Sequence, residues 1–489
     1  RVTSSGGASR LTFVPRSRSA DPLGIPHPTA MELEAYGPML AQYGGQGELH
    51  ASGGRIFKGP VRCGQLRDGH TILLFNPSSD PGNFPITYPI EADHLEGVDS
   101  CGRLVQCRGL LSINDLTSPS GFLQNYAARA RQIEVRPDRS EAPEFIEYSL
   151  VNFRFTGDPS LGDRNNDVRA FRVESEFNGA EARFEFRSVE GYSQVSRRLQ
   201  ATRGIEPTSV LRIPGSQPDP GALADAICYL LSISRGTKIQ WVSHRELFTT
   251  GPPDAVVHYN RVTRPYVGLG PIDVELLDPT VEFLQASLPE YAERASSYRF
   301  DRGLLDAVID ARVEGDFIET RAAKLAIALE ALKAVHPASE FILDPAEMDE
   351  LLPDLVQAVE SVLREGQIKK SKIEQIGGVG GVRGLNRRSF RSQLRAVLKD
   401  IGITLSHREA SLFIACRNKL VHTGRFYCAA GTPEEFERVE PLASKLDEYL
   451  FMLHTLDRIF LALVGWKGTY LDRRIPSAPA PILVTEFLL

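Results

Sequence analysis

The spacing of apolar residues changes near residue 275, and this change limits what the chain can fold into. Between about 55 and 265, short runs such as Val151, Phe153 and Phe155 place an apolar residue at every second position. This is the period of a strand with one buried face. Beyond 275 the apolar residues recur at steps of three and four, as in a helix with one buried stripe. The clearest such stripe is formed by Ile318, Ala322, Leu325, Leu329 and Leu332. We therefore predict an α+β protein, with an N-terminal β-rich region (an antiparallel sheet, a sandwich or a barrel) and a C-terminal all-α helix bundle.

Turn and capping residues mark the expected ends of individual elements. Asn178-Gly179 predicts a hairpin, because both residue types tolerate positive φ. Ser406 with Glu409 three residues later predicts a capping box at the start of a helix. One helix near 221–234 is expected to interrupt the β-rich region. Further helices are predicted at 317–335, 344–365 and 389–400 and from Thr432 to Leu463, where Pro441 could introduce a kink, with a Gly-rich loop at 377–384.

The length of 489 residues is too great for one hydrophobic core and predicts several domains. We expect a flexible segment at 1–50, a β-rich recognition or sensor domain at 51–270, a helical domain at 271–475 and a tail at 476–489. The first twenty residues are basic and rich in Ser and Gly, and they lack the apolar core of a secretory signal. Residues 1–30 are expected to be disordered, with Met31 as a candidate start.

Composition indicates a cytoplasmic protein with no membrane partner. The chain is 42% hydrophobic and 24% charged, as globular proteins are, and no run reaches the roughly 18 apolar residues of a membrane span. Its six cysteines form no C-x-x-C pair, which favours reduced thiols over a disulfide framework. Cys101 and Cys107 could ligate a metal together with His94, but their spacing matches no known zinc pattern. We therefore predict no metal and no cofactor.

Charge is distributed unevenly along the chain. The net charge is −6, which by itself argues against a nucleic-acid partner. Residues 364–425, however, contain 14 Lys or Arg against 4 Asp or Glu, so this segment carries 14 − 4 = +10. Such a patch would attract phosphate groups and release counterions on binding. The alternative is a solvated helix face whose charge is offset by acidic residues from elsewhere in the fold.

A short motif near the end of the helix that begins after Ser406 combines polar residues of matched chemistry. Arg417 lies on the apolar stripe that we assign to Ala410, Phe413, Ile414, Leu420 and Val421. Asn418 and His422 are four residues apart and share an adjacent face, and Gly424 ends the helix. An imidazole can move protons near neutral pH, and a guanidinium can stabilise charge on a phosphate. The alternative is a structural role for both residues. A His at the C-terminal end of a helix can interact favourably with the negative end of the helix dipole, and a buried Arg often pairs with a carboxylate.

The sequence around this motif resembles the HEPN superfamily. Residues 415–424 (ACRNKLVHTG) are similar to its R-N-x-x-x-H signature, and three further segments resemble parts of Apea-like HEPN domains. These segments are 328–332 (ALEAL), 385–390 (LNRRSF) and 465–470 (GWKGTY). The resemblance covers about 275 to 475.

The resemblance implies a bundle that dimerises, with two motifs meeting at the interface. It also implies a metal-independent endoribonuclease that leaves 2′,3′-cyclic phosphate ends, acting as an antiphage-defence or abortive-infection effector. Arg417, Asn418 and His422 would be catalytic, and Glu330 and Lys419 would support them. Arg383, Arg387 and Arg388 are candidate RNA contacts. The expected partners are RNA, a second copy of the chain, and a phage-derived trigger or partner protein.

Three other interpretations stay open. The bundle could be a non-catalytic dimerisation or nucleic-acid-binding partner of a separate effector. It could also be the substrate of a nucleotide-transferring partner, with Tyr470 or Tyr427 as the acceptor. Glu330 could be a purely structural partner of Arg417. In the β-rich region, residues 241–245 (WVSHR) could stack on bases, but a strand with one buried face is favoured.

Overall fold

The chain divides into two compact units, one ending at Ile133 and the other beginning at Glu134. The computed structural model describes residues 33–76, 92–117, 123–136, 142–163, 165–249, 255–261, 264–267, 270–273, 277–298, 302–313, 315–335, 341–472 and 480–484. The segment expected to be disordered at 1–30, Met31 and most of the tail at 476–489 lie outside these ranges. The predicted domain boundary near 270 falls inside the second unit.

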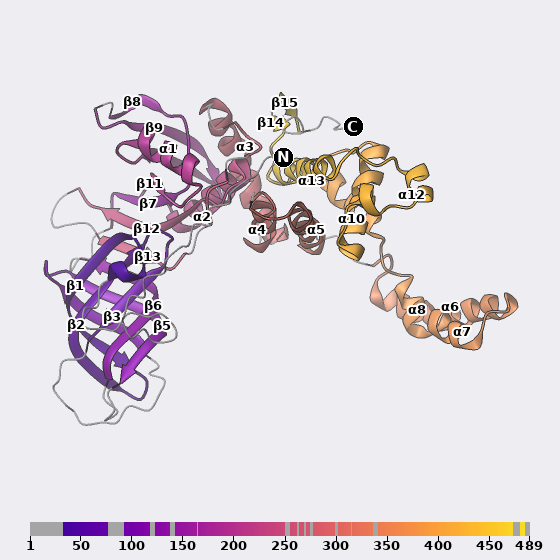
Figure 1. Ribbon diagram of the computed structural model, residues 1–489, viewed down its shortest axis with the longest axis horizontal. Helices are drawn as coiled ribbons and strands as arrows, with labels where there is room; N and C mark the ends of the chain where they lie inside the picture. The colour runs from indigo at the N-terminus through magenta and orange to yellow at the C-terminus, as the bar shows by residue number, and fades with distance from the viewer. Residues whose placement is uncertain are drawn as a thin grey trace, which may run out of the picture. The chain divides into compact units, whose positions relative to one another are not determined.

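The first unit is a closed antiparallel barrel of six strands (Figure 1). The strands are β1 (Met39–Ala51), β2 (Arg55–Leu66), β3 (Thr71–Phe75), β4 (Ala92–Asp99), β5 (Leu104–Thr117) and β6 (Leu123–Arg136), preceded by a 3-10 turn at Leu33–Tyr36. Their order is β3-β2-β1-β4-β5-β6, and pairing of β3 with β6 closes the ring. Closure leaves no strand edge unpaired, which protects the barrel against edge-to-edge association. The expected β-rich region is confirmed, and of its alternative forms the barrel is present.

Alternation of side chains separates the barrel's interior from its outer face. Leu49, Leu95 and Cys107 face inward and are fully buried. Their neighbours along the strands point outward, because successive strand residues face opposite sides. His50 and His94 are thus half-buried on the outer surface, each flanking an inward residue.

The second unit begins with a seven-stranded antiparallel sheet. Its order is β13-β12-β7-β11-β10-β9-β8, from β7 (Phe145–Val151), β8 (Asp158–Asp163), β9 (Val168–Phe177), β10 (Ala180–Ser188), β11 (Pro207–Pro214), β12 (Gln240–Leu247) and β13 (Ala255–Tyr259). Asn178 and Gly179 join β9 to β10 with φ of 52° and 74°, so the predicted hairpin is confirmed. The helix expected near 221–234 is α2 (Pro220–Arg235), capped by Asp219. A second helix, α1 (Tyr192–Thr202), was not predicted, because only Tyr192 and Leu199 of its residues are buried.

The rest of the second unit is helical. The helices are α3 (Leu277–Tyr298), α4 (Arg302–Asp310), α5 (Ile318–Val335), α6 (Pro345–Glu365), α7 (Lys370–Gly377), α8 (Val379–Gly384), α9 (Phe390–Asp400), α10 (His407–Thr423), α11 (Tyr427–Ala430), α12 (Pro433–Arg438) and α13 (Lys445–Leu463). A short hairpin follows, from β14 (Thr469–Asp472) and β15 (Ala480–Leu483). The helices predicted at 317–335, 344–365, 389–400 and after Ser406 are all present. No helix of the described residues is long and apolar enough to cross a membrane.

Two predictions in the helical region were wrong. The stretch 377–384 was expected to be a loop, yet it holds the end of α7 and all of α8. Val382 is fully buried against Met348 and Leu352, so packing on α6 outweighs the low helix propensity of the glycines. The single helix expected from Thr432 to Leu463 is two helices. Pro441 lies in the break, where its ring prevents helical continuation, and Ser444 caps the start of α13.

Helix α13 is the most buried helix of the second unit. Nearly every residue from Glu448 to Leu463 is buried, including the ionisable Glu448, Asp457 and Arg458. One hydrophobic core extends from the seven-stranded sheet through α2 and α3 to α5, α10 and α13. The core therefore holds α10, which carries the motif, in a fixed position against α5 and α13.

Candidate active site

The motif lies on the last turns of α10, whose two ends are well defined. The predicted capping box is confirmed, since Ser406 Oγ accepts from Glu409 N and the Glu409 carboxylate accepts from Ser406 N at 2.7 Å. At the other end Gly424 adopts φ of 66°, and its N–H donates to Leu420 O. These caps fix the length of the helix and place the motif at its C-terminal end.

Arg417 is held by residues from three helices. Its guanidinium forms an ion pair with Glu330 of α5, and Nη1 donates to Asn418 Oδ1 at 2.9 Å. Its Cζ also lies 4.6 Å from the ring centre of Phe390 on α9, a cation–π contact. The side chain is only 12% exposed, and Nε has no hydrogen-bond partner among the described residues. Glu330 is 33% exposed, so the pair lies at the edge of the core with one side toward solvent.

His422 has a different environment from Arg417. It lies in the last turn of α10 and is exposed to solvent, and the described residues give its side chain no hydrogen bond or ion pair. Asn418, one turn earlier, is half-buried. The last turns of α10 therefore carry both an anchored cation and an accessible imidazole.

Of the predicted buried stripe of α10, Phe413 and Leu420 are buried, whereas Ala410 and Ile414 are half-buried. Val421 was assigned to it, but its side chain is 45% exposed. The residues that face the core are Leu412, Phe413, Cys416 and Leu420. Each helical residue turns by about 100°, so Val421 falls outside this stripe and lies beside His422 on the surface.

Lys419, predicted to support the site, points to another helix. Its ammonium forms an ion pair with Glu435 of α12 at 2.9 Å. The hydrogen bond from Lys419 is the largest cause that lowers the pKa of the Glu435 carboxyl. Lys419 is therefore placed to join α10 to α12.

The three arginines proposed as RNA contacts lie near α6 and α8. Arg383 pairs with Asp349 at 2.7 Å, and Arg388 Nε donates to Phe341 O at 3.0 Å. Arg387 is exposed. Acidic residues from outside the basic segment also pair with Arg408 (Glu440, 3.0 Å) and with Lys419. Part of the segment's positive charge is therefore offset within the fold, as the alternative interpretation anticipated.

An arginine-lined hollow in the second unit was not anticipated from the sequence. It has a volume of about 290 Å³, and Arg154, Arg169 and Arg197 line it together with Tyr192, Ser193 and Ser196. No carboxylate is among the residues that line it. Arg154 is oriented by Ser196, whose Oγ accepts from Nε at 2.9 Å. The hollow depends on α1, which brings together residues from separate parts of the chain, so no local pattern could have indicated it.

Other residues considered from the sequence have structural surroundings. Trp241 is buried in β12, and its Nε1 donates to Asp225 at 2.8 Å, which confirms the favoured interpretation of residues 241–245 as a strand with one buried face. Tyr470 is 1% exposed, and the Tyr427 hydroxyl donates to the backbone oxygen of Glu435 at 2.8 Å. Both phenols are thus enclosed, which argues against either as a nucleotide acceptor.

The metal set considered at Cys101, Cys107 and His94 does not come together. Cys107 is fully buried inside the barrel, where a hydrogen bond to Cys63, followed by burial, raises the pKa of its thiol. His94 lies on the outer face of β4, and Cys101 is exposed in the turn after it. These three side chains therefore cannot share one ion.

No family model matches the chain, and neither the curated proteins nor the solved structures include a significant match to it.

Proposed function

We propose that the protein is a metal-independent endoribonuclease of the HEPN type, which cuts RNA and leaves 2′,3′-cyclic phosphate ends. The observation that carries the proposal is the C-terminal end of α10. There Arg417 is held by Glu330 and Phe390, while His422 is exposed. An anchored cation and an accessible proton carrier are two of the groups that metal-free phosphodiester cleavage needs.

In the proposed reaction, the ribose 2′-oxygen attacks the adjacent phosphorus and the bond to the 5′-oxygen breaks. The proton of the 2′-hydroxyl goes to a base, and the departing 5′-oxygen receives a proton. His422 is the proposed proton carrier, because it is solvent-accessible and its residue type titrates near neutral pH. Arg417 would stabilise the charge that develops on the phosphate oxygens.

Glu330 and Asn418 would position Arg417. The ion pair with Glu330 and the hydrogen bond to Asn418 Oδ1 restrict the guanidinium before RNA arrives. Asn418 accepts through its oxygen, which leaves its amide nitrogen as a donor toward phosphate or imidazole. Restricting these groups in advance lowers the ordering cost of the transition state.

A second copy would complete the site. Cleavage needs one group that accepts a proton and one that donates it, and the motif contains one His. Two copies meeting at the ends of α10 would bring two His422 side chains to one phosphate. Mixing wild type with an excess of His422→Ala chains should then lower the activity per wild-type chain, because each mixed pair keeps a single His422. Full activity of a monomer would contradict the shared site.

The second unit also offers a surface to an anionic ligand. The hollow lined by Arg154, Arg169 and Arg197 has no carboxylate among its lining residues, so it suits phosphate groups. This supports RNA, or a phosphate-bearing trigger, as a partner. We propose that the protein acts in the cytoplasm as an antiphage-defence effector, with its β-rich region in a sensing role.

The deciding experiment is cleavage of total RNA and tRNA in EDTA, followed by analysis of the end groups. His422→Ala should cleave RNA at least about 100-fold more slowly than wild type, as expected when a general acid–base group is removed. His407→Ala is the matched control, since it removes an exposed histidine from the opposite end of α10. Equal cleavage by wild type and His422→Ala would overturn the assignment of His422.

The second candidate function is a non-catalytic RNA-binding or dimerisation module. The observation in its favour is the Arg417–Glu330 ion pair, which by itself could serve only to pack α10 on α5. In that case wild type and His422→Ala would bind RNA equally and neither would cleave it.

A further inference from the structure

The outer face of the barrel brings together two histidines and a glutamate from neighbouring strands. His50 of β1 lies directly opposite His94 of β4 in the antiparallel register. Side chains at such paired positions have Cβ atoms about 5 Å apart. Glu96 lies two residues beyond His94, so it projects from the same face of β4. The register of β1 and β4 therefore gathers three side chains whose residue types ligate metals.

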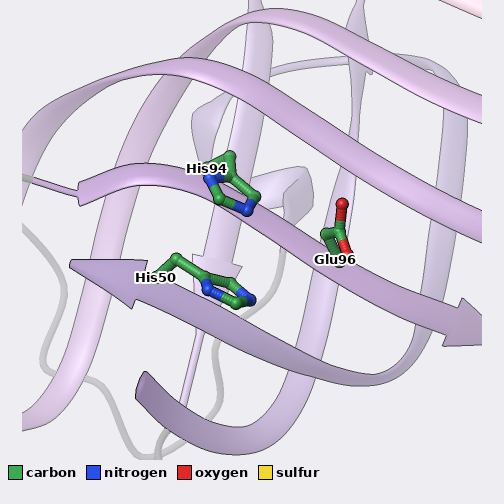
Figure 2. A group of neighbouring side chains, drawn as sticks. All are labelled: His50, His94 and Glu96. Carbon is green, nitrogen blue, oxygen red and sulfur yellow. The ribbon is translucent and has the colours of Figure 1, made fainter. Parts of the chain in front are cut away.

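The three side chains already lie close to one another. The rings of His50 and His94 are stacked, with their centres 4.3 Å apart and their planes 12° from parallel. One ligating atom from each of the three residues lies within 4.8 Å of the other two. Figure 2 shows the two imidazoles side by side on adjacent strands, with Glu96 farther along the strand of His94.

We propose that His50, His94 and Glu96 bind a divalent transition-metal ion of the zinc class. Two imidazoles and one carboxylate suit Zn²⁺, and imidazoles also suit Ni²⁺ and Cu²⁺. Zinc bonds of about 2.0–2.2 Å require the ligand atoms to approach to roughly 3.4 Å. Side-chain rotation can provide this approach, since all three residues are half-buried or exposed. Three protein ligands leave a fourth position for water or for an external ligand.

Neighbouring polar groups support the carboxylate. Gln106 of β5 donates through Nε2 to Glu96 Oε1 at 2.9 Å, and Gln106 Oε1 in turn accepts from Arg108 Nη2 at 2.9 Å. Such outer hydrogen bonds orient metal ligands and strengthen binding. Glu96 Oε1 is thus engaged by Gln106, while the second oxygen can face the ion.

The charged neighbours of the three side chains are engaged with other groups. Glu48 lies opposite Glu96 in the register, and its carboxylate pairs with Lys58 at 2.6 Å. Arg108 lies opposite His94 on β5, but its guanidinium is directed to Gln106. Glu96 therefore supplies the negative charge among the three proposed ligands.

The site is separate from the proposed ribonuclease chemistry, which needs no metal. It lies in the first compact unit, whereas the motif of α10 belongs to the second. An ion bound there would join β1 to β4 and stabilise the barrel by binding only its folded form. This assigns a metal-dependent property to the β-rich region, whichever function the helices have.

Calorimetric titration of the full chain with ZnCl₂ tests the proposal. We expect one ion per chain, an affinity at least tenfold weaker in His50→Ala and in His94→Ala, and a smaller loss in Glu96→Gln. Cobalt should give a visible absorption band that is lost in the same variants. Far-UV circular dichroism of each variant confirms folding, which these surface substitutions should not disturb.

Two control variants separate this site from other zinc ligands. His70→Ala removes an imidazole from the same unit, and Cys101→Ser removes an exposed thiol. Both should bind zinc as wild type does. The proposal is overturned if wild type binds no stoichiometric zinc. It is also overturned if His50→Ala and His94→Ala bind zinc as tightly as wild type, or if Cys101→Ser abolishes binding. RNA cleavage in EDTA by His50→Ala tests the ribonuclease independently, and it should be unchanged.

Discussion

The two ends of α10 each carry an arginine–carboxylate pair, but in opposite surroundings. Near its start, Glu409 pairs with Arg458 of α13 at 3.3 Å, and both side chains are fully buried. Near its end, Arg417 pairs with Glu330 of α5, where the side chains are 12% and 33% exposed. The same chemical pair thus lies inside the core at one end and at its edge at the other.

This difference in exposure distinguishes an ion pair that only stabilises the fold from one that a ligand can reach. The buried pair is surrounded by further protein groups, since Arg458 Nε also donates to Val484 O at 2.9 Å. Water and substrate cannot reach it. At the exposed end, solvent reaches Glu330 and His422, so RNA could meet the guanidinium there. Accessibility, and not the presence of an ion pair, distinguishes the candidate site.

Removing the buried carboxylate should have the largest effect on stability. Glu409→Ala leaves the Arg458 charge buried without its partner and should cost about 3–5 kcal/mol of the free energy of unfolding. Glu330→Ala should cost only about 1 kcal/mol, because water can replace a partly exposed carboxylate. Chemical denaturation of both variants measures the contrast.

A double variant controls for simple failure to fold. Glu409→Leu combined with Arg458→Met replaces the buried pair by apolar side chains and should be close to wild type in stability. Equal losses in Glu409→Ala and Glu330→Ala would show that the two ends of α10 do not differ as proposed.

Arg417→Lys should reduce RNA cleavage by about 100-fold or more, in line with the loss of one oriented donor to a charged transition state. Lysine keeps the charge but loses the planar fork that contacts Glu330, Asn418 and the Phe390 ring. Arg425→Lys, an exposed position just beyond the helix, is the matched control and should retain activity. Single-turnover rates at saturating RNA distinguish this loss from weaker binding.

The stability of the protein should depend on pH through His258. His258 of β13 is buried, and burial, followed by the nearby His244, lowers its pKa from 6.5 to about 4. The unfolded chain therefore binds a proton more readily, so stability should fall as the pH drops from 6.5 toward 4. The lowering of this pKa from 6.5 to about 4 corresponds to a loss of about 3 kcal/mol in the free energy of unfolding.

Denaturation curves between pH 4 and 7 test this pH dependence. His258→Gln should flatten the decline, whereas His422→Gln, which alters an exposed residue, should leave it as in wild type. Parallel curves for wild type and His258→Gln would contradict the role of His258.

The smallest effect is expected at the helix cap. Ser406→Ala removes the hydroxyl that accepts from Glu409 N at 3.1 Å, and it should cost about 1 kcal/mol. Ser389→Ala removes the equivalent cap of α9, and it provides a comparison outside α10. If Ser406→Ala loses as much stability as Glu409→Ala, the cap must also hold the buried Glu409–Arg458 ion pair in place.

Much of the element pattern could be predicted because its causes are local. The stripe from Ile318 to Leu332 and the cap at Ser406 act within a few residues, and the two helices predicted from them are present. Val421 and the glycines of α8 were misjudged for the opposite reason. The exposure of Val421 and the burial of Val382 in α8 depend on which neighbouring helix packs there, and no local spacing records that.

Only part of the candidate site could be predicted from the sequence. Arg417, Asn418 and His422 follow from a short motif, and Glu330 was an open choice between a supporting and a structural role. The structure places Glu330 against Arg417, although 87 positions separate them. It also directs Lys419 to Glu435 of α12, a pairing that no local pattern could predict.

Hydrophobic period and capping act over short distances, so the two classes of secondary structure, most helix boundaries and the motif of α10 follow from the sequence. Three further features follow only from the folded chain: six strands close into a barrel, His50 lies beside His94, and one arginine pair of α10 is buried while the other reaches solvent. These outcomes depend on strand register and helix packing between distant segments, which are set by the whole fold acting together.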